Sequence, residues 1–300
     1  MGKAKVIVAG ANGMIGNALV RALRARGDEV VPLVRKPGAG EAGWDGRTVP
    51  PSVIEGADAV VNLAGANVAG KRWSPEYKQL ILESRTLSTR ALVEAIRGAT
   101  RRPRVLLNAS AVGYYGGRGD EVLDESAAPG SDFLAGVCQA WEQEARGVES
   151  LAVRSVQART GVVVSRTGGA LEKMLPPFKA FVGGPIGSGK QWMPWIHLED
   201  EVAALVYCLD HDSLRGPVNL AAPGTVTMKD FARALGKALH RPSWAPVPAG
   251  PLKLLLGEFA EVLTEGQRAV PKKLLDAGFR FKHAEVLEAL QDAVGSARAA

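Results

Sequence analysis

Three glycines near the start of the chain have the spacing that binds phosphate. They lie in the run Gly10-Ala-Asn-Gly13-Met-Ile-Gly16. Gly10 permits a tight turn, Gly13 lets the backbone approach a phosphate, and Gly16 lets a helix pack closely on a strand. Such a turn points free N–H groups and the positive end of a helix dipole at a pyrophosphate. The loop predicts a dinucleotide site, with a glycine-rich turn that binds no ligand as the alternative.

The residues on both sides of this loop have the patterns of a strand and a helix. The run 5–9 is apolar and rich in β-branched residues, as in a buried strand. Ile15, Leu19 and Leu23 then follow at helical spacing, and Gly27 closes the helix. This context makes the glycine spacing specific, because a bare glycine triplet often occurs by chance.

The end of the second strand indicates which dinucleotide binds. The strand 29–34 runs into Arg35, Lys36 and Pro37, where an NAD site usually has an acidic residue for the ribose 2′-hydroxyl. A guanidinium suits a 2′-phosphate instead. We therefore expect NADP(H) to bind in preference to NAD(H). The alternative is a solvated basic turn.

Composition sets the class of protein. The chain has 300 residues, of which 46% are hydrophobic and 23% charged, as in an ordinary globular protein. The first strand starts directly after Met1-Gly2-Lys3, and no apolar stretch has membrane-spanning length. We therefore expect a cytoplasmic protein without a membrane partner.

Cysteine content and net charge indicate neither a metal nor a nucleic acid. Cys138 and Cys208 provide no disulfide framework, and no Cys/His cluster has metal-ligand spacing, so we expect no structural metal. The net charge is +6 and the run 101–104 is basic, but basic residues are otherwise scattered and not interleaved with aromatics. We expect a solvated surface and no nucleic-acid partner.

Strand and helix patterns alternate further along, as in a Rossmann-type α/β fold with a doubly wound parallel sheet. We expect strands over 57–65, which ends in a loop of small residues, and over 104–110, 155–159 and 218–221. We expect helices over 77–97 and over a segment that 195–200 opens and that runs to about residue 209. We expect residues 1–165 to form the NADP-binding domain, and residues from about 195 to 222 to complete its sheet. Residues 166–194 and 225–300 form a smaller C-terminal substrate lobe, which we expect to be loop-rich directly after residue 165 and mostly helical from about residue 225. Ligands bind at the carboxyl ends of the strands, so 63–65, Ser110 and 161–163 line one cleft.

A second glycine-rich segment resembles a P-loop. Gly184 to Lys190 fits the spacing GxxxxGK, but Gln191 replaces the Ser or Thr that would bind Mg²⁺. Pro194 also interrupts the helix that a P-loop requires. We therefore do not expect ATP to bind here.

Several motifs resemble the extended or atypical short-chain dehydrogenase/reductases, and more narrowly their SDR39U1-like (YfcH-like) epimerase family. The resemblance to the extended or atypical short-chain dehydrogenase/reductases lies in the glycine loop and in residues 62–65, 110–116 and 195–200. The resemblance to the SDR39U1-like branch lies in residues 133–142, 159–164, 168–178 and 183–189, and in a C-terminal domain that contains 256–258 and 271–279. The resemblance covers nearly the whole chain. It implies an NADP(H)-binding Rossmann domain, and its relatives include proteins labelled as sugar-nucleotide epimerases. It also implies that Arg85 lies near the cofactor; the alternative is an ordinary exposed arginine on a helix.

The catalytic pair of that larger family is missing. Its Tyr and Lys should fall on Leu134 and Cys138, which supply neither a phenolic acid nor a cation. The Ser or Thr that accompanies this pair in the family should fall on Ala111, if one counts back from the Tyr-Gly pair at 115–116. Ser110 occupies that position only if the loop has one extra residue. The usual acid–base chemistry is therefore not predicted.

Four other side chains could act instead. Tyr114 and Tyr115 follow Ser110, but no Lys lies at helical spacing to lower the pKa of either phenol, so packing in the cleft is an equal alternative. The sequence around Cys138 predicts a small buried apolar side chain rather than a nucleophile. His197 reads as a residue that joins a strand to the start of a helix.

Two hypotheses of function remain. The first is an NADP-dependent oxidoreductase or epimerase of a small or sugar-nucleotide substrate, with an atypical proton donor between Ser110 and Tyr115. The second is a catalytically silent NADP(H)-sensing protein whose C-terminal lobe meets a partner. The catalytic group and the substrate are unassigned, and a homodimer stays open. The expected cofactor-binding residues are Gly10, Asn12, Gly13, Met14, Ile15, Gly16, Arg35, Lys36, Leu63, Ala64, Gly65, Arg85, Ser110 and Val163.

Overall fold

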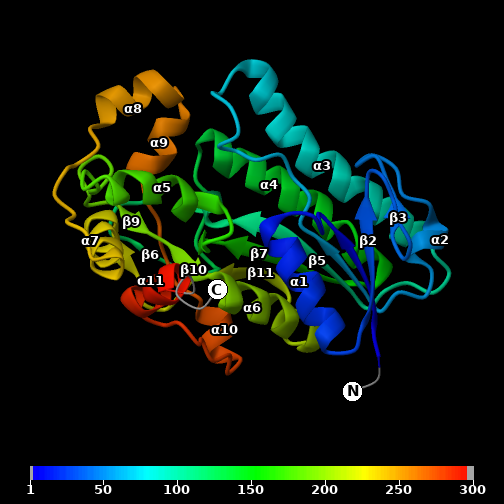
Figure 1. Cartoon of the computed structure of the whole chain (residues 1–300). Coiled ribbons are helices and arrows are strands. Elements are labelled where there is room, and N and C mark those ends of the chain that lie inside the picture. Colours follow the sequence, from blue (N-terminus) through cyan, green and yellow to red (C-terminus); the bar gives the residue numbers. More distant parts are fainter. Residues whose placement is uncertain (1–2, 296–300) are drawn as a thin grey trace.

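A seven-stranded parallel sheet forms the centre of the molecule (Figure 1). The computed structural model describes residues 3–295, so the ends of the two expected domains, 1–2 and 296–300, lie outside it. The strand order is β11-β7-β5-β4-β1-β2-β3. The strands are β1 Lys5–Ala9, β2 Glu29–Val34, β3 Ala42–Gly43, β4 Ala59–Asn62, β5 Val105–Ala111, β7 Arg154–Thr160 and β11 Gly216–Leu220. The predicted doubly wound α/β fold is confirmed.

Helices cover both faces of this sheet, as the right-handed crossovers between parallel strands require. On one face lie α1 Met14–Ala25 and α6 Leu198–Asp210, whose apolar side chains share a core with β1, β5 and β7. On the other lie α2 Pro51–Ile54, α3 Pro75–Gly98 and α4 Phe133–Arg146. The carboxyl ends of β1, β4 and β5 therefore meet at one edge, between the two helical layers.

The smaller lobe is built from short strand pairs and helices, at the left of Figure 1. Its strands are β8 Val162–Val164 with β10 Trp195–His197, and β9 Trp192–Met193 with β12 Val226–Thr227. Its helices are α5 Gly169–Lys179, α7 Met228–Leu239, α8 Ala249–Leu256, α9 Phe259–Thr264 and α11 Val286–Gly295. The pair β6 Val122–Leu123 and β13 Arg268–Ala269 links this part to the sheet. Asn219 of β11 donates to the carbonyls of Leu123 in β6 and of Val270, the residue directly after β13.

Two features differ from the expectation for this lobe. The segment after residue 165, expected to be loop-rich, contains α5 in spite of Pro176 and Pro177, because Leu171 and Phe178 are buried in the lobe's core. The short helix α10 Lys272–Asp276 instead sends Leu274 into the core of the large domain. In the described part of the chain, no helix is long and apolar enough to cross a membrane.

Candidate functional site

The glycine loop between β1 and α1 has the close contacts that exclude a side chain. A Cβ on Gly10, which has φ +78°, would come within 2.6 Å of the Leu63 carbonyl carbon. A Cβ on Gly16 would stand 2.2 Å from the Gly10 oxygen. Gly13 begins α1 with no side-chain cap, and the first turn has no acidic residue. The free N–H groups at the N-terminus of α1 therefore suit a phosphate ligand.

The basic pair expected for the 2′-phosphate follows β2 directly. Arg35 and Lys36 are exposed, one and two residues beyond Val34. They lie at the carboxyl edge of β2, the strand next to β1 in the sheet. That is the position from which an NADP-binding fold reaches the adenosine ribose.

Arg85 of α3 adds a half-buried cation to the same edge. Its guanidinium lies beside the loop that follows β4, where a Cβ on Gly65 would come within 3.2 Å of Cζ, and it donates to the Ala66 carbonyl at 3.1 Å. It also lies 5.0 Å from the centre of the Trp141 ring. Burial lowers the pKa of Arg85, and among described residues its charge interacts with the Cys138 thiol and the Tyr77 hydroxyl but with no carboxylate. A partly desolvated cation without an anionic partner fits an anionic ligand.

A buried polar network fixes the helices around this cation. Asn62 of β4 donates to Asn108 of β5 at 2.7 Å and to Thr89 of α3 at 2.9 Å. The Trp141 indole of α4 donates to the same Thr89 hydroxyl. Sequence reasoning missed this network, although two asparagines inside apolar strands were the available signal.

The family's catalytic positions hold groups that do little acid–base chemistry. Cys138 is only 4% exposed, and burial raises the pKa of its thiol to about 12. Its interpretation as a buried hydrophobe is confirmed. Leu134 precedes it by one turn of α4. Neither residue can donate or accept a proton near neutral pH.

Ser110 is buried and points its hydroxyl toward α4. It donates a 2.7 Å hydrogen bond to Oε1 of Glu142. The same carboxylate is bound twice by Arg159 of β7, through Nε at 2.8 Å and a terminal nitrogen at 2.9 Å. Arg146 adds a longer contact of 3.3 Å. Sequence reasoning missed this ion pair, whose signal was a charged residue within a buried strand.

Both tyrosines belong to the surroundings of Arg159. The Tyr115 hydroxyl donates to Asn219 at 2.7 Å and accepts from Arg159 at 3.0 Å, and its ring is fully buried. Burial raises the pKa of Tyr115 to about 12. The Tyr114 ring lies 3.4 Å from the guanidinium carbon of Arg159. Packing and hydrogen bonding therefore account for both residues.

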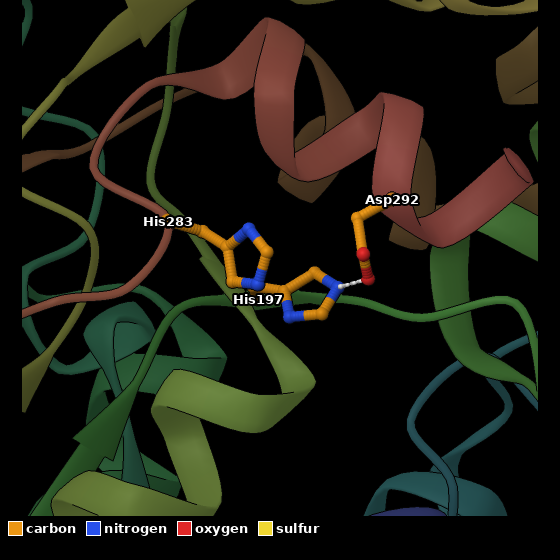
Figure 2. Close-up of side chains that lie close together, drawn as sticks. All are labelled: His197, His283 and Asp292. Atoms are coloured by element: carbon orange, nitrogen blue, oxygen red, sulfur yellow. Dashed lines mark ion pairs between the residues drawn. The ribbon is translucent and has the colours of Figure 1, made fainter. Parts of the chain in front are cut away.

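His197 ends β10 and caps α6, as the sequence predicts. Within residues 3–295, one group of His, Cys, Asp and Glu side chains lies close enough to suggest a metal, and it contains His197, His283 and Asp292, with donor atoms within 4.8 Å of one another (Figure 2). However, Nδ1 of His197 accepts the backbone N–H of Glu199, so Nε2 carries the proton and faces Asp292 at 3.4 Å. Burial next to His283 also lowers the pKa of His197. Because a metal needs an unprotonated nitrogen, we interpret the group as a contact between β10 and α11.

The segment 184–190 is not a P-loop. Strand β9 follows it where a helix would be needed, and a Cβ on Gly184 would stand 2.2 Å from the Ala245 oxygen. Part of this segment lines a cavity of about 440 Å³ together with the loop 117–120 and the end of α9.

Two family profiles match the chain. The NAD dependent epimerase/dehydratase family matches residues 6–221, and a domain of unknown function, DUF1731, matches residues 247–293. The chain therefore belongs to the NAD-dependent epimerase/dehydratase family, whose members share this Rossmann-like fold.

Its relatives define the branch within that family. Epimerase family protein MT2273 of Mycobacterium tuberculosis is 44% identical over 295 residues, with 97% of each chain covered. The chloroplastic SDR39U1 homolog of Arabidopsis thaliana is 42% identical, over 95% of this chain and 85% of that protein. The crystal structure of human SDR39U1 with NADPH superposes with a TM-score of 0.90 at 35% identity, over 97% of this chain and 99% of the human one. The predicted SDR39U1-like family is confirmed.

Proposed function

We propose that this protein binds NADP(H) at the carboxyl edge of β1, β2 and β4. The observation that carries the proposal is the glycine loop, in which Gly10 and Gly16 leave no room for a Cβ. The human relative crystallised with NADPH supports the same cofactor. The diphosphate lies against the N-terminus of α1, Arg35 and Lys36 bind the 2′-phosphate, and Arg85 faces the diphosphate or the nicotinamide ribose.

A fluorescence titration of cofactor-stripped protein with NADPH and NADH tests this proposal. We expect NADPH to bind more tightly, and Arg35→Ala to remove about ten- to a hundredfold of that affinity while NADH binding stays unchanged. Arg24→Ala, an exposed change at the far end of α1, is the matched control. Equal weakening of both cofactors by Arg35→Ala would contradict the role of Arg35, and no binding of either cofactor would contradict the site.

For the chemistry, we propose an oxidoreductase or epimerase that acts on a small or sugar-nucleotide substrate without the Tyr–Lys pair. NADP(H) supplies or accepts the hydride when bound. The described residues offer one proton path at this edge, in which Ser110 takes a proton from a substrate hydroxyl as it passes its own to Glu142. Arg159 orients that carboxylate through two hydrogen bonds.

Hydride exchange measures this chemistry directly. Deuterium from labelled NADPH should enter a candidate carbonyl or sugar-nucleotide substrate, and Ser110→Ala should slow the exchange at saturating NADPH by more than it weakens NADPH binding. Ser155→Ala, which removes another buried serine hydroxyl from the neighbouring strand, is the control. Equal exchange by Ser110→Ala and the unmodified protein would exclude the path through Ser110.

A second candidate is a silent NADP(H)-sensing protein, favoured by Leu134 and Cys138 at the catalytic positions. A partner that binds the NADPH form more tightly than the NADP⁺ form would support it, and detectable hydride exchange would contradict it. In either case we propose a cytoplasmic site of action, small-molecule or protein ligands rather than nucleic acid, and no structural metal.

A further inference from the structure

Three large apolar side chains lie together on the surface of the smaller lobe. Phe181, Val182 and Trp244 are 54%, 51% and 67% exposed. The Trp244 indole donates to the Phe181 carbonyl at 3.0 Å, so residues far apart in the sequence form one surface. We call these three residues the Trp244 patch. Trp is enriched among the residues that contribute most to the binding energy of protein interfaces, and Phe is enriched in interface cores, so this patch has the composition of a binding surface.

The backbone holds this patch in place. The backbone N–H of Trp244 donates to the Gly183 carbonyl. The backbone N–H of Val247 donates to the Pro185 carbonyl, and that of Gly187 donates to the Val247 carbonyl. Phe181 has φ +65°, which a residue with a bulky side chain rarely adopts. A preformed aromatic surface loses little conformational freedom when a partner binds.

A basic hollow adjoins the patch. It has a volume of about 460 Å³ and is lined by Arg233, Gly236, Lys237, His240, Arg241 and Ser243. The Arg241 guanidinium lies 4.5 Å from the centre of the Phe181 ring, so the hollow and the patch share this side chain. Asp230 pairs with Arg233 at 3.1 Å, but no described carboxylate pairs with Lys237 or Arg241. The hollow therefore keeps a positive charge.

We propose that the Trp244 patch and the basic hollow together bind an acidic segment of a partner protein that also carries an apolar side chain. The carboxylates of the segment enter the hollow, and its apolar side chain packs on Trp244 and Phe181. An anionic membrane would offer similar chemistry, but the Asp230 carboxylate beside Arg233 would repel a uniformly anionic lipid surface, whereas a peptide needs carboxylates only at Lys237 and Arg241. These residues are separate from the expected cofactor residues, so the proposal does not rest on NADP(H) binding.

Fluorescence anisotropy with a labelled peptide of alternating Glu and Phe tests the proposal on the full-length protein. We expect saturable binding that falls about tenfold or more in Trp244→Ala and in Arg241→Glu. A charge-reversed peptide of Lys and Phe should not bind. Arg24→Glu, which alters an exposed arginine on α1, should bind the acidic peptide as the unmodified protein does. Circular dichroism of each variant verifies the fold.

Three outcomes would overturn the proposal. The first is no preference for the acidic peptide over the Lys peptide. The second is tighter, Trp244-dependent binding to phosphatidylserine vesicles than to the peptide, which would assign the surface to membranes. The third is self-association that Trp244→Ala abolishes, measured by light scattering, which would assign the surface to a second copy of this chain.

Discussion

Arg159 and Glu142 form a buried, doubly hydrogen-bonded ion pair directly behind the end of β5. Their side chains are 2% and 0% exposed, and Arg159 Nε lies 2.8 Å from Glu142 Oε1. The pair joins β7 to α4, the helix on which the family's catalytic Tyr and Lys would stand. The charges of Arg159 and Glu142 face one another inside the protein, whereas the Arg85 guanidinium beside the loop after β4 forms no ion pair with a described carboxylate.

Removing one member of the pair should destabilise the protein. Arg159→Met leaves a buried carboxylate with only the Ser110 hydroxyl and the longer Arg146 contact, so we expect a loss of about 3–5 kcal/mol in the free energy of unfolding. Urea denaturation measures it. The double variant Arg159→Met/Glu142→Leu should recover most of the loss, because no charge is left unpaired. A single variant within about 0.5 kcal/mol of the unmodified protein would show that the pair is not structural.

Arg85→Met should weaken the binding of NADPH but leave the binding of a shorter probe unchanged. Adenosine 2′,5′-bisphosphate has the 2′-phosphate but lacks the nicotinamide ribose, so a role of Arg85 at that end predicts unchanged binding of the probe. We expect a loss of about tenfold or more for NADPH. Isothermal titration calorimetry measures both ligands, with Arg97→Met, an exposed change on the same helix, as control. Equal losses for both ligands would place Arg85 at the phosphate next to the adenosine rather than at the nicotinamide ribose.

Local sequence patterns were sufficient to predict the fold, whereas contacts between residues far apart in the chain could not be predicted. The loop from Gly10 to Gly16 could be predicted because its whole requirement, a turn between a strand and a helix, lies within a few residues. The pairing of Glu142 with Arg159 could not, because it depends on how α4 packs on β7. Helix α5 was missed for a similar reason, since the burial of Phe178 outweighs the two prolines that precede it.

Gly16→Ala should abolish tight NADPH binding. The added methyl would stand 2.2 Å from the Gly10 oxygen and would push α1 away from β1. We expect a loss of about 1–3 kcal/mol of stability as well. Gly136→Ala on α4, where a Cβ meets nothing within 4 Å, should instead be neutral or stabilising by up to about 1 kcal/mol. Thermal unfolding and cofactor titration of the two variants compare the effects, and unimpaired NADPH binding by Gly16→Ala would refute the predicted site.

Tyr115→Phe should affect stability but not cofactor binding. The change leaves the Asn219 side-chain oxygen without its 2.7 Å donor in a buried site, which costs about 1–3 kcal/mol. With a pKa of about 12, the phenol is not an acid near neutral pH, so any hydride exchange should also continue. Denaturation and exchange measured on the same preparation test both statements. Loss of exchange with normal stability would make Tyr115 catalytic after all.

Glu201 should make the protein less stable as the pH rises from about 4.5 to 8. Its side chain is buried at the start of α6, with Thr160 as its one hydrogen-bond donor among described residues, and burial raises its pKa to about 8 from an ordinary 4.5. Between these values the folded protein holds a proton that the unfolded chain has lost. The stabilisation is therefore complete below pH 4.5 and disappears above pH 8, with a size of at most about 5 kcal/mol. Glu201→Gln should flatten the fall in unfolding free energy across this range, whereas the exposed control Glu288→Gln should not. Identical pH profiles for Glu201→Gln and the unmodified protein would mean that Glu201 is already ionised in the fold.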